Sequence, residues 1–235
     1  MRYLFWWKAF RPNNIDCFNA SYFFIITNCL AVFYECFVSF GEMISKLGPV
    51  GAGLYGFFNR LLIPTGLHHA LNSVFWFDVA GINDIGKFWG TVSGGIKGVT
   101  GMYQAGFFPV MMFGLPAAAI AIYQSARPER KNKLERFYCL LLLLHLLLGL
   151  QNHLEFSFMF VAPVLYFIHA LLTGIMLFVA AVFKWLAGFG FSAGLIDYIL
   201  SIKAPFSNDI FMLIPLGLIC AFIYYCIFSI YDSSL

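Results

Sequence analysis

Apolar residues gather along this chain in long stretches that short polar segments separate. Several stretches approach the roughly 20 residues that a helix needs to cross a bilayer. The pattern therefore predicts an all-α polytopic membrane protein with about five or six spanning helices, some of them re-entrant or broken. The predicted spans are Ser21–Phe40, Gly48–Ile63, Met102–Tyr123, Phe137–Gly149, Phe156–Leu186 and Asp209–Tyr231.

Proline and glycine interrupt two of these spans. Pro64 and Gly66 follow the second predicted span, so the piece after it is expected to be broken or re-entrant, with its backbone buried against other helices. Pro109 and Pro116 lie inside the third, which predicts a kinked span or a span in two pieces. Asp78–Thr100 is Gly-rich and too polar to span. It is either a lid near a substrate path or an external loop.

The composition supports a membrane protein and excludes a soluble domain. Hydrophobic residues make up 61% of the chain, charged residues 11%, and the mean hydropathy is +0.83. The net charge of +3 is too small and too scattered to indicate a nucleic-acid partner. Five of the 14 Lys and Arg residues fall between Arg127 and Arg136, so this loop is expected to be cytoplasmic.

The cysteines indicate neither a metal site nor a disulfide framework. None of them forms a C-x-x-C pair, and their surroundings are apolar. The sequence therefore predicts no metal and no cofactor. The cysteines are Cys17, Cys29, Cys36, Cys139, Cys220 and Cys226.

Three ionisable residues mark the second predicted span and its break as a candidate site. They are Arg60, His68 and His69. An ionisable group at the centre of a membrane helix costs about 2.5–3.5 kcal/mol on insertion scales, so it usually faces a pore, a partner or a substrate. In the alternative, Arg60 snorkels to a headgroup and the histidines sit at a helix end. A sugar needs donors and acceptors that converge in a cavity with an aromatic wall, and Arg60 and His68 supply donors.

Four blocks of sequence carry a family resemblance. They are Arg60–Asn72 (RLLIPTGLHHALN), Gly106–Pro116 (GFFPVMMFGLP), Leu154–Pro163 (LEFSFMFVAP) and Gly188–Tyr198 (GFGFSAGLIDY). Together they resemble the sugar-transporting membrane subunit, enzyme IIC, of the bacterial phosphoenolpyruvate-dependent phosphotransferase system, in its glucose and N-acetylglucosamine branch. The resemblance covers most of the chain from Val38 to Tyr231.

The resemblance implies sugar transport across the bacterial plasma (inner) membrane coupled to phosphorylation, with N-acetylglucosamine or glucose as substrate. Family members have an amino-terminal half that dimerises and a carboxy-terminal half that holds the sugar, and this chain resembles mainly the second. We expect residues 1–37 to form an amino-terminal segment with one membrane helix, and residues 38–235 a partial transport domain. The expected partners are the sugar, phosphorylated enzyme IIB, membrane lipid and, if the amino-terminal half is present, a second copy of the chain.

Two other functions stay open. None of the cysteines lies in the motif that passes phosphate to the sugar, so the chain alone is not expected to transfer phosphate. The second possible function is therefore that of a non-enzymatic membrane fragment that binds sugar or assembles with a separate amino-terminal half. The third reading is an uncoupled secondary transporter, for which Glu155 and Asp197 are the evident candidates for an ion site.

The resemblance also assigns roles to residues. Arg60 and His68 line the sugar site, together with the glutamate of a Thr-Glu-Pro motif whose position is occupied here by Asn152. Asparagine cannot act as a base, so we expect no confident catalytic residue, and Glu155 is the best remaining carboxylate. The alternative role of Glu155 is to cap free N–H groups at a helix N-terminus. His169 is expected to be a packed helix residue. Further substrate-binding candidates are Thr65, His69 and Asn72.

Two windows of the chain fit a reading-frame shift. Gly149–His153 can be written GGA TTA CAG AAC CAT, and the same bases read from the third give Ile-Thr-Glu-Pro, which the family carries before Leu-Glu-Phe. Likewise, codons for Phe5–Asn14 read from the second base give Phe-Gly-Gly-Lys-Arg-Phe-Val-Pro-Ile, a sequence that resembles a family loop. We therefore expect residues 1–37 and 134–153 to be out-of-frame translations of a family gene.

Overall fold

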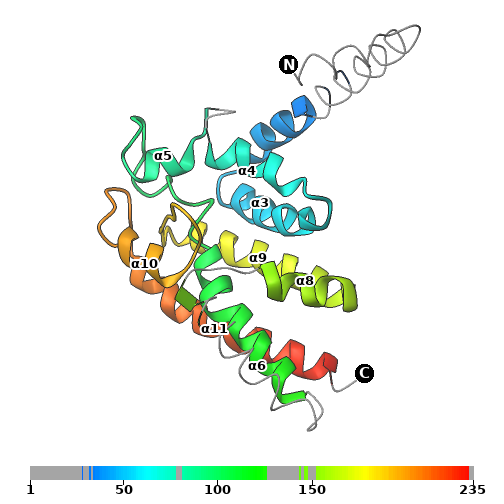
Figure 1. Ribbon diagram of the computed structural model, residues 1–235. Helices are drawn as coiled ribbons and strands as arrows, with labels where there is room; N and C mark the ends of the chain where they lie inside the picture. The colour runs from blue at the N-terminus through cyan, green and yellow to red at the C-terminus, as the bar shows by residue number, and fades with distance from the viewer. Residues whose placement is uncertain are drawn as a thin grey trace, which may run out of the picture.

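The structure of the chain is a computed structural model that describes residues 28, 32, 34–77, 81–125, 143, 146–147 and 152–232. Within these residues the fold is all-helical, as predicted, and apart from one isolated bridge between Leu186 and Asn208 it has no β-structure (Figure 1). The helices are residues 34–45, α3 (Pro49–Leu61), the 3-10 turn η1 (Ile63–Thr65), α4 (His68–Trp76), α5 (Asp84–Phe88), the π-helix η3 (Pro109–Gly114), α6 (Leu115–Ser125), α8 (Asn152–Val161), α9 (Pro163–Val182), α10 (Leu195–Ser201), η4 (Ile210–Met212) and α11 (Leu213–Asp232).

Two helix pairs organise the packing. Helix α3 packs along α9, and α11 packs against the π-helix and α6. Figure 1 shows α9 between α3 and α11, with α5 and α10 at one end of the molecule. Helix α9 therefore connects the segment that carries Arg60 with the pair that contains α11.

Two of the described helices are long and apolar enough to cross a membrane. They are Pro163–Val182, which is α9, and Ile210–Tyr231, which includes α11. The predicted number of about five or six spans is not confirmed. The first and fourth predicted spans lie largely outside the described residues, and α3 has only 13 residues.

The chain breaks where proline removes a backbone donor. The predicted span Phe156–Leu186 is divided at Ala162, whose φ of −136° and ψ of 75° are not helical, and Pro163 begins α9. The residue before a proline is driven out of the helical region by contact with the proline ring. The third predicted span is not broken at Pro109: Phe108 keeps a helical φ of −59° and ψ of −50°, and the chain continues through the π-helix into α6. The break at Pro163 therefore has a local covalent cause.

The predicted break after α3 is present, but its predicted burial is wrong. Helix α3 ends at Leu61, and Gly66 adopts a left-handed φ of 75° before α4 begins. Pro64, Thr65 and Gly66 are exposed. The turn does not need neighbouring helices, because it satisfies its own backbone: the amide of Thr65 donates to Leu62 O at 3.2 Å and that of Gly66 to Ile63 O at 2.9 Å.

The polar segment after α4 is pinned by one buried carboxylate. Asp84, at the start of α5, is 4% exposed. One of its oxygens accepts from the amide of Gly101 at 2.8 Å and the other from Gln104 Nε2 at 2.9 Å. Gln104 Oε1 in turn accepts from the amide of Phe189 at 3.0 Å. This network ties the polar segment to the segment that follows α9.

Candidate functional site

A cavity of about 280 Å³ lies where α3, α4, the π-helix, α8 and the segment after α9 meet. Its size is close to the ~300 Å³ at which small-molecule sites begin. Its wall combines aromatic rings with polar side chains, a composition that suits a ligand with both apolar faces and hydroxyl groups. The lining residues are Asn59, Arg60, Ile63, His68, His69, Asn72, Trp76, Met111, Phe156, Phe189, Phe191, Ser192 and Ala193.

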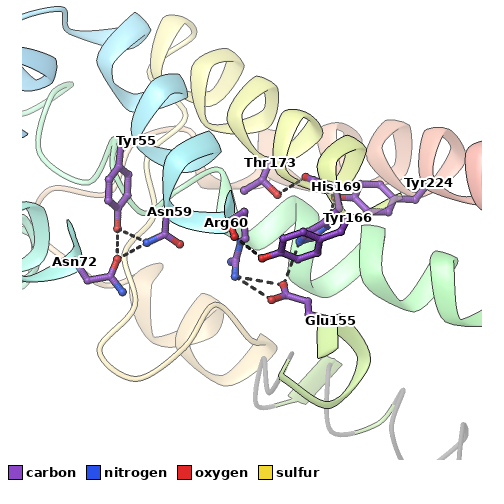
Figure 2. Close-up of polar contacts among 9 residues, drawn as sticks. All are labelled: Tyr55, Asn59, Arg60, Asn72, Glu155, Tyr166, His169, Thr173 and Tyr224. Carbon is purple, nitrogen blue, oxygen red and sulfur yellow. Dashed lines mark hydrogen bonds and ion pairs between the residues drawn. The ribbon is translucent and has the colours of Figure 1, made fainter. Parts of the chain in front are cut away.

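Arg60 forms the charged centre of the site. It lies in the last turn of α3 and is 1% exposed, with its guanidinium carbon 4.8 Å from the centre of the Phe107 ring. Its Nη1 lies 3.2 Å from Oε1 and 3.4 Å from Oε2 of Glu155, which is equally buried on α8 (Figure 2). The fold thus neutralises the arginine charge inside the protein.

Behind the ion pair, further hydrogen bonds connect it with α9 and α11. His169 Nε2 lies 3.2 Å from Glu155 Oε1, and His169 Nδ1 lies 2.7 Å from the hydroxyl of Tyr224 (Figure 2). The hydroxyl of Tyr166 donates to the backbone carbonyl of Arg60. Both histidine and Tyr224 are fully buried. Side chains from three helices, α8, α9 and α11, therefore hold the arginine in place.

A second polar cluster joins α3 to α4 beside the cavity. The hydroxyl of Tyr55 donates to Asn72 Oδ1 at 2.8 Å, and Asn59 Nδ2 donates to the same oxygen (Figure 2). These donors use the carbonyl oxygen of Asn72, and its amide nitrogen donates to no other group among the described residues. Asn59 and Asn72 both line the cavity.

Three nitrogens of the cavity residues lack a hydrogen-bond partner among the residues that the structure describes. They are Arg60 Nε, His68 Nδ1 and Trp76 Nε1. A buried polar atom without a partner costs about 1–3 kcal/mol. A ligand with several hydroxyl groups relieves that cost if small side-chain rotations bring these nitrogens to it.

The structure brings most of the predicted substrate-binding residues together. Arg60, His68, His69 and Asn72 line the cavity, and the rings of the two histidines lie 3.9 Å apart. Thr65 does not line it, since its exposed hydroxyl donates to Leu62 O at 2.8 Å. Glu155 does not line it either; it contacts Arg60 from behind.

Sequence reasoning missed several residues of the site. Asn59 and Trp76 line the cavity. Both lie next to the motif Arg60–Asn72 in the sequence, and this closeness along the chain could have indicated them. His169 is packed in its helix, as expected, but nothing in the sequence indicated its contact with Glu155. Asn152 is the first residue of α8, and its side chain lies outside the described part of the chain.

Comparisons with known proteins identify the family of this chain. The family described as "Phosphotransferase system, EIIC" matches residues 17–174, more than half of the chain. The N-acetylglucosamine-specific EIICBA component of Escherichia coli (strain K12) is 44% identical over 200 residues, covering 81% of this chain and 30% of the relative. The N-acetylglucosamine-specific EIICB component of Bacillus subtilis (strain 168) is 40% identical, covering 86% of this chain and 44% of the relative.

A glucose-specific relative has similar identity. The EIICBA component of Staphylococcus saprophyticus is 43% identical over 184 residues, covering 74% of this chain and 27% of the relative. This chain therefore spans less than half the length of each of these three relatives. The length of the family match and these identities lead to one conclusion: the chain belongs to the phosphotransferase system EIIC family.

Proposed function

We propose that this chain is the sugar-binding part of a phosphotransferase-system permease that carries N-acetylglucosamine or glucose into the cell and phosphorylates it. The observation that supports this proposal best is the cavity, in which a buried Arg60 meets histidine, asparagine and aromatic side chains. Aromatic rings pack against the apolar face of a sugar ring, and the polar groups bond its hydroxyls.

The choice of sugar follows the relatives. Two of the relatives above are named as N-acetylglucosamine-specific and one as glucose-specific. N-acetylglucosamine is therefore the first substrate to test. The amide nitrogen of Asn72 is a suitable donor for a sugar hydroxyl or for the acetamido carbonyl.

The proposed partners are the phosphorylated enzyme IIB domain, lipid and a second copy of the chain. The relatives' names join EIIC to further components, EIICB and EIICBA, which supports the first. Exposed apolar side chains along α9 and α11 support lipid contact; they include Val164, Phe167, Leu218 and Phe222. We also propose a boundary at residue 38 and, if the amino-terminal half is present, a homodimer. The family match begins at residue 17, inside the proposed amino-terminal segment.

A non-enzymatic sugar-binding fragment is the less favoured alternative. Every relative named above is a phosphotransferase-system component. What supports this alternative is that Asn152 occupies the position of the Thr-Glu-Pro glutamate. It predicts sugar binding without phosphate transfer.

Two measurements test the proposal. The first is binding of radiolabelled N-acetylglucosamine and glucose to the purified full chain, compared between the wild type, Arg60→Gln and the exposed-site control Lys46→Gln. We expect the Arg60 variant to lose binding and the Lys46 variant to retain it. The second is phosphoenolpyruvate-dependent uptake in cells that lack their own permease for these sugars. Binding without uptake supports the non-enzymatic alternative, and absence of binding by the wild type contradicts the proposed function.

A further inference from the structure

The Arg60–Glu155 pair has a second hydrogen-bonding layer on the side away from the cavity. Oε1 of Glu155 is shared between Arg60 Nη1 and His169 Nε2, each at 3.2 Å. Arg60 lines the cavity, while neither Glu155 nor His169 does. His169 therefore touches the group that holds the arginine, but not the space that a ligand occupies.

The direction of these hydrogen bonds follows from the chemistry of the groups. A carboxylate paired with arginine only accepts, so His169 Nε2 carries the proton and donates to Glu155. In the neutral ring Nδ1 then accepts, and the Tyr224 hydroxyl at 2.7 Å is its donor. The His169 backbone carbonyl accepts from Thr173 Oγ1 at 2.9 Å, which fixes the helix turn that carries the ring. The ring is thus oriented from both sides.

Without the hydrogen bond from His169, the Glu155 carboxylate would be less constrained, and the Arg60 guanidinium that it holds would change direction more freely. Side chains that contact a ligand must be held by supporting hydrogen bonds to keep a productive geometry. The supports of Arg60 come from α8, α9 and α11, and those on α9 and α11 belong to the two helices able to span a membrane.

We propose that His169 is a positioning residue for substrate binding: through Glu155 it fixes the direction of the Arg60 guanidinium at the cavity, with Tyr224 orienting the ring. The inference rests on the proposed function for its substrate, a hexose or N-acetylhexosamine. Its structural part, the control of Arg60 by His169, stands apart from any sugar.

A pair of nearly isosteric substitutions separates positioning from packing. His169→Gln retains an amide that donates to Glu155, whereas His169→Met has a similar shape and no donor. If His169 only filled space, the two variants would behave alike. We expect the Gln variant to bind N-acetylglucosamine within about threefold of the wild type and the Met variant to bind about tenfold more weakly, the effect of losing a hydrogen bond to a charged group.

A second readout makes no use of sugar. Phenylglyoxal modifies arginine side chains whose guanidinium is not held in an ion pair or hydrogen bond. Mass spectrometry gives the rate of this modification at Arg60 relative to that at Arg127, in the basic loop of the same molecule. We expect the relative rate at Arg60 to rise several-fold in His169→Met and to stay near the wild-type value in His169→Gln. If the Met variant does not fold, Tyr224→Phe replaces it, with an expected rise of about twofold because only the outer hydrogen bond is lost.

The outcomes divide cleanly. Equal Arg60 reactivity in the Gln and Met variants, or an unchanged rate in Tyr224→Phe where that variant replaces Met, overturns the inference whatever the binding data show. A difference in reactivity with no sugar binding by the wild type supports the control of Arg60 and contradicts the proposed function. Differences in both readouts support both. A well-folded His169→Gln chain that loses sugar binding and releases Arg60 also overturns the inference, since the donor is then not what matters.

Discussion

Arg60 and Glu155 are opposite charges that the fold removes from solvent, each only 1% exposed. Moving such charges out of water costs several kcal/mol per ion, and the attraction between them offsets that cost only when further hydrogen bonds complete the site. His169 supplies one of these bonds to Glu155, and the Tyr166 hydroxyl donates to the backbone carbonyl of Arg60. An arrangement this costly is better explained by a ligand that needs the arginine than by stability alone.

Tyr55→Phe tests the cluster that orients Asn72. The change removes the donor at 2.8 Å from Asn72 Oδ1 and leaves the ring in place. We expect sugar affinity to fall roughly three- to tenfold, because a buried hydrogen bond of about 1 kcal/mol is lost and the amide of Asn72 is less constrained. Tyr225→Phe is the matched control, since the hydroxyl of that exposed tyrosine bonds only Gln124 in the described residues. Equal affinities in both variants would contradict the role of Tyr55.

Asp84 predicts a dependence of stability on pH. Burial raises the pKa of this carboxyl from 3.8 to about 6, although bonds from Gly101 and Gln104 and the charge of Lys87 oppose the rise. Between about pH 4 and pH 6 the folded chain holds a proton that the unfolded chain has released, so stability increases as the pH falls through this window. The carboxyl lies in the polar segment, outside the two spanning helices.

The measurement compares thermal unfolding of the wild type with that of Asp84→Asn, which does not titrate. We expect the wild type to gain on the order of 2 kcal/mol relative to the variant between pH 7.5 and pH 4.5. A difference between the two chains that stays constant over this range would show that Asp84 does not titrate as proposed.

At the scale of elements, interruptions decide where the site lies. Helix α3 stops at Leu61, the π-helix begins at Pro109, and α9 begins at Pro163. The last turn of α3 and the π-helix both contribute to the cavity wall, through Arg60 and Met111, and π-helical turns are frequent at functional sites. The prolines at or near these positions were visible in the sequence. The neighbours of each helix end were not, because they come from segments far apart along the chain.

Gly106→Ala tests the close contact between the start of the third predicted span and α9. A Cβ at this position would lie 2.4 Å from Leu177 Cα and 2.5 Å from its amide nitrogen, both backbone atoms that cannot rotate away. We expect a loss of about 1–3 kcal/mol, seen as a lower midpoint of thermal unfolding. Gly190→Ala is the control, because its Cβ would meet no atom within 4 Å. If both variants unfold at the wild-type temperature, the segment does not pack this tightly on α9.

At the scale of the whole molecule, family membership and the two apolar helices place the chain in the bacterial inner membrane. The polar segment and the segment after α9 lie together, joined by Asp84 and Gln104, and Phe189 carries this contact to the cavity wall. The link is indirect, because Gln104 lies after the polar segment, so the lid and the plain external loop both stay predictions.

Resequencing tests the reading-frame hypothesis for residues 134–153, most of which lie outside the described part of the chain. We expect the bases that encode Gly149–His153 to yield Ile-Thr-Glu-Pro in the neighbouring frame. If they do, and a corrected gene restores one continuous frame, the corrected protein regains the glutamate at the position of Asn152 and we expect phosphoenolpyruvate-dependent uptake to return. Bases that exclude Ile-Thr-Glu-Pro in any frame would refute the hypothesis.

The sequence by itself determined the helical class, the membrane location and the segment that carries the site. These properties depend on local facts: long apolar stretches, prolines without an amide donor, and ionisable residues in an apolar segment. It predicted four of the cavity residues, because they lie within one short motif.

Only the tertiary structure decided which groups meet. Glu155 is 95 positions from Arg60, and Tyr224 is 55 positions from His169. No periodicity of one helix reports such a pairing, since it depends on how several helices pack together. The structure also showed that the Pro64–Gly66 turn is exposed and that Glu155 lies behind the arginine rather than in the cavity. Burial is a property of the packed chain, so local sequence carried no signal for either result.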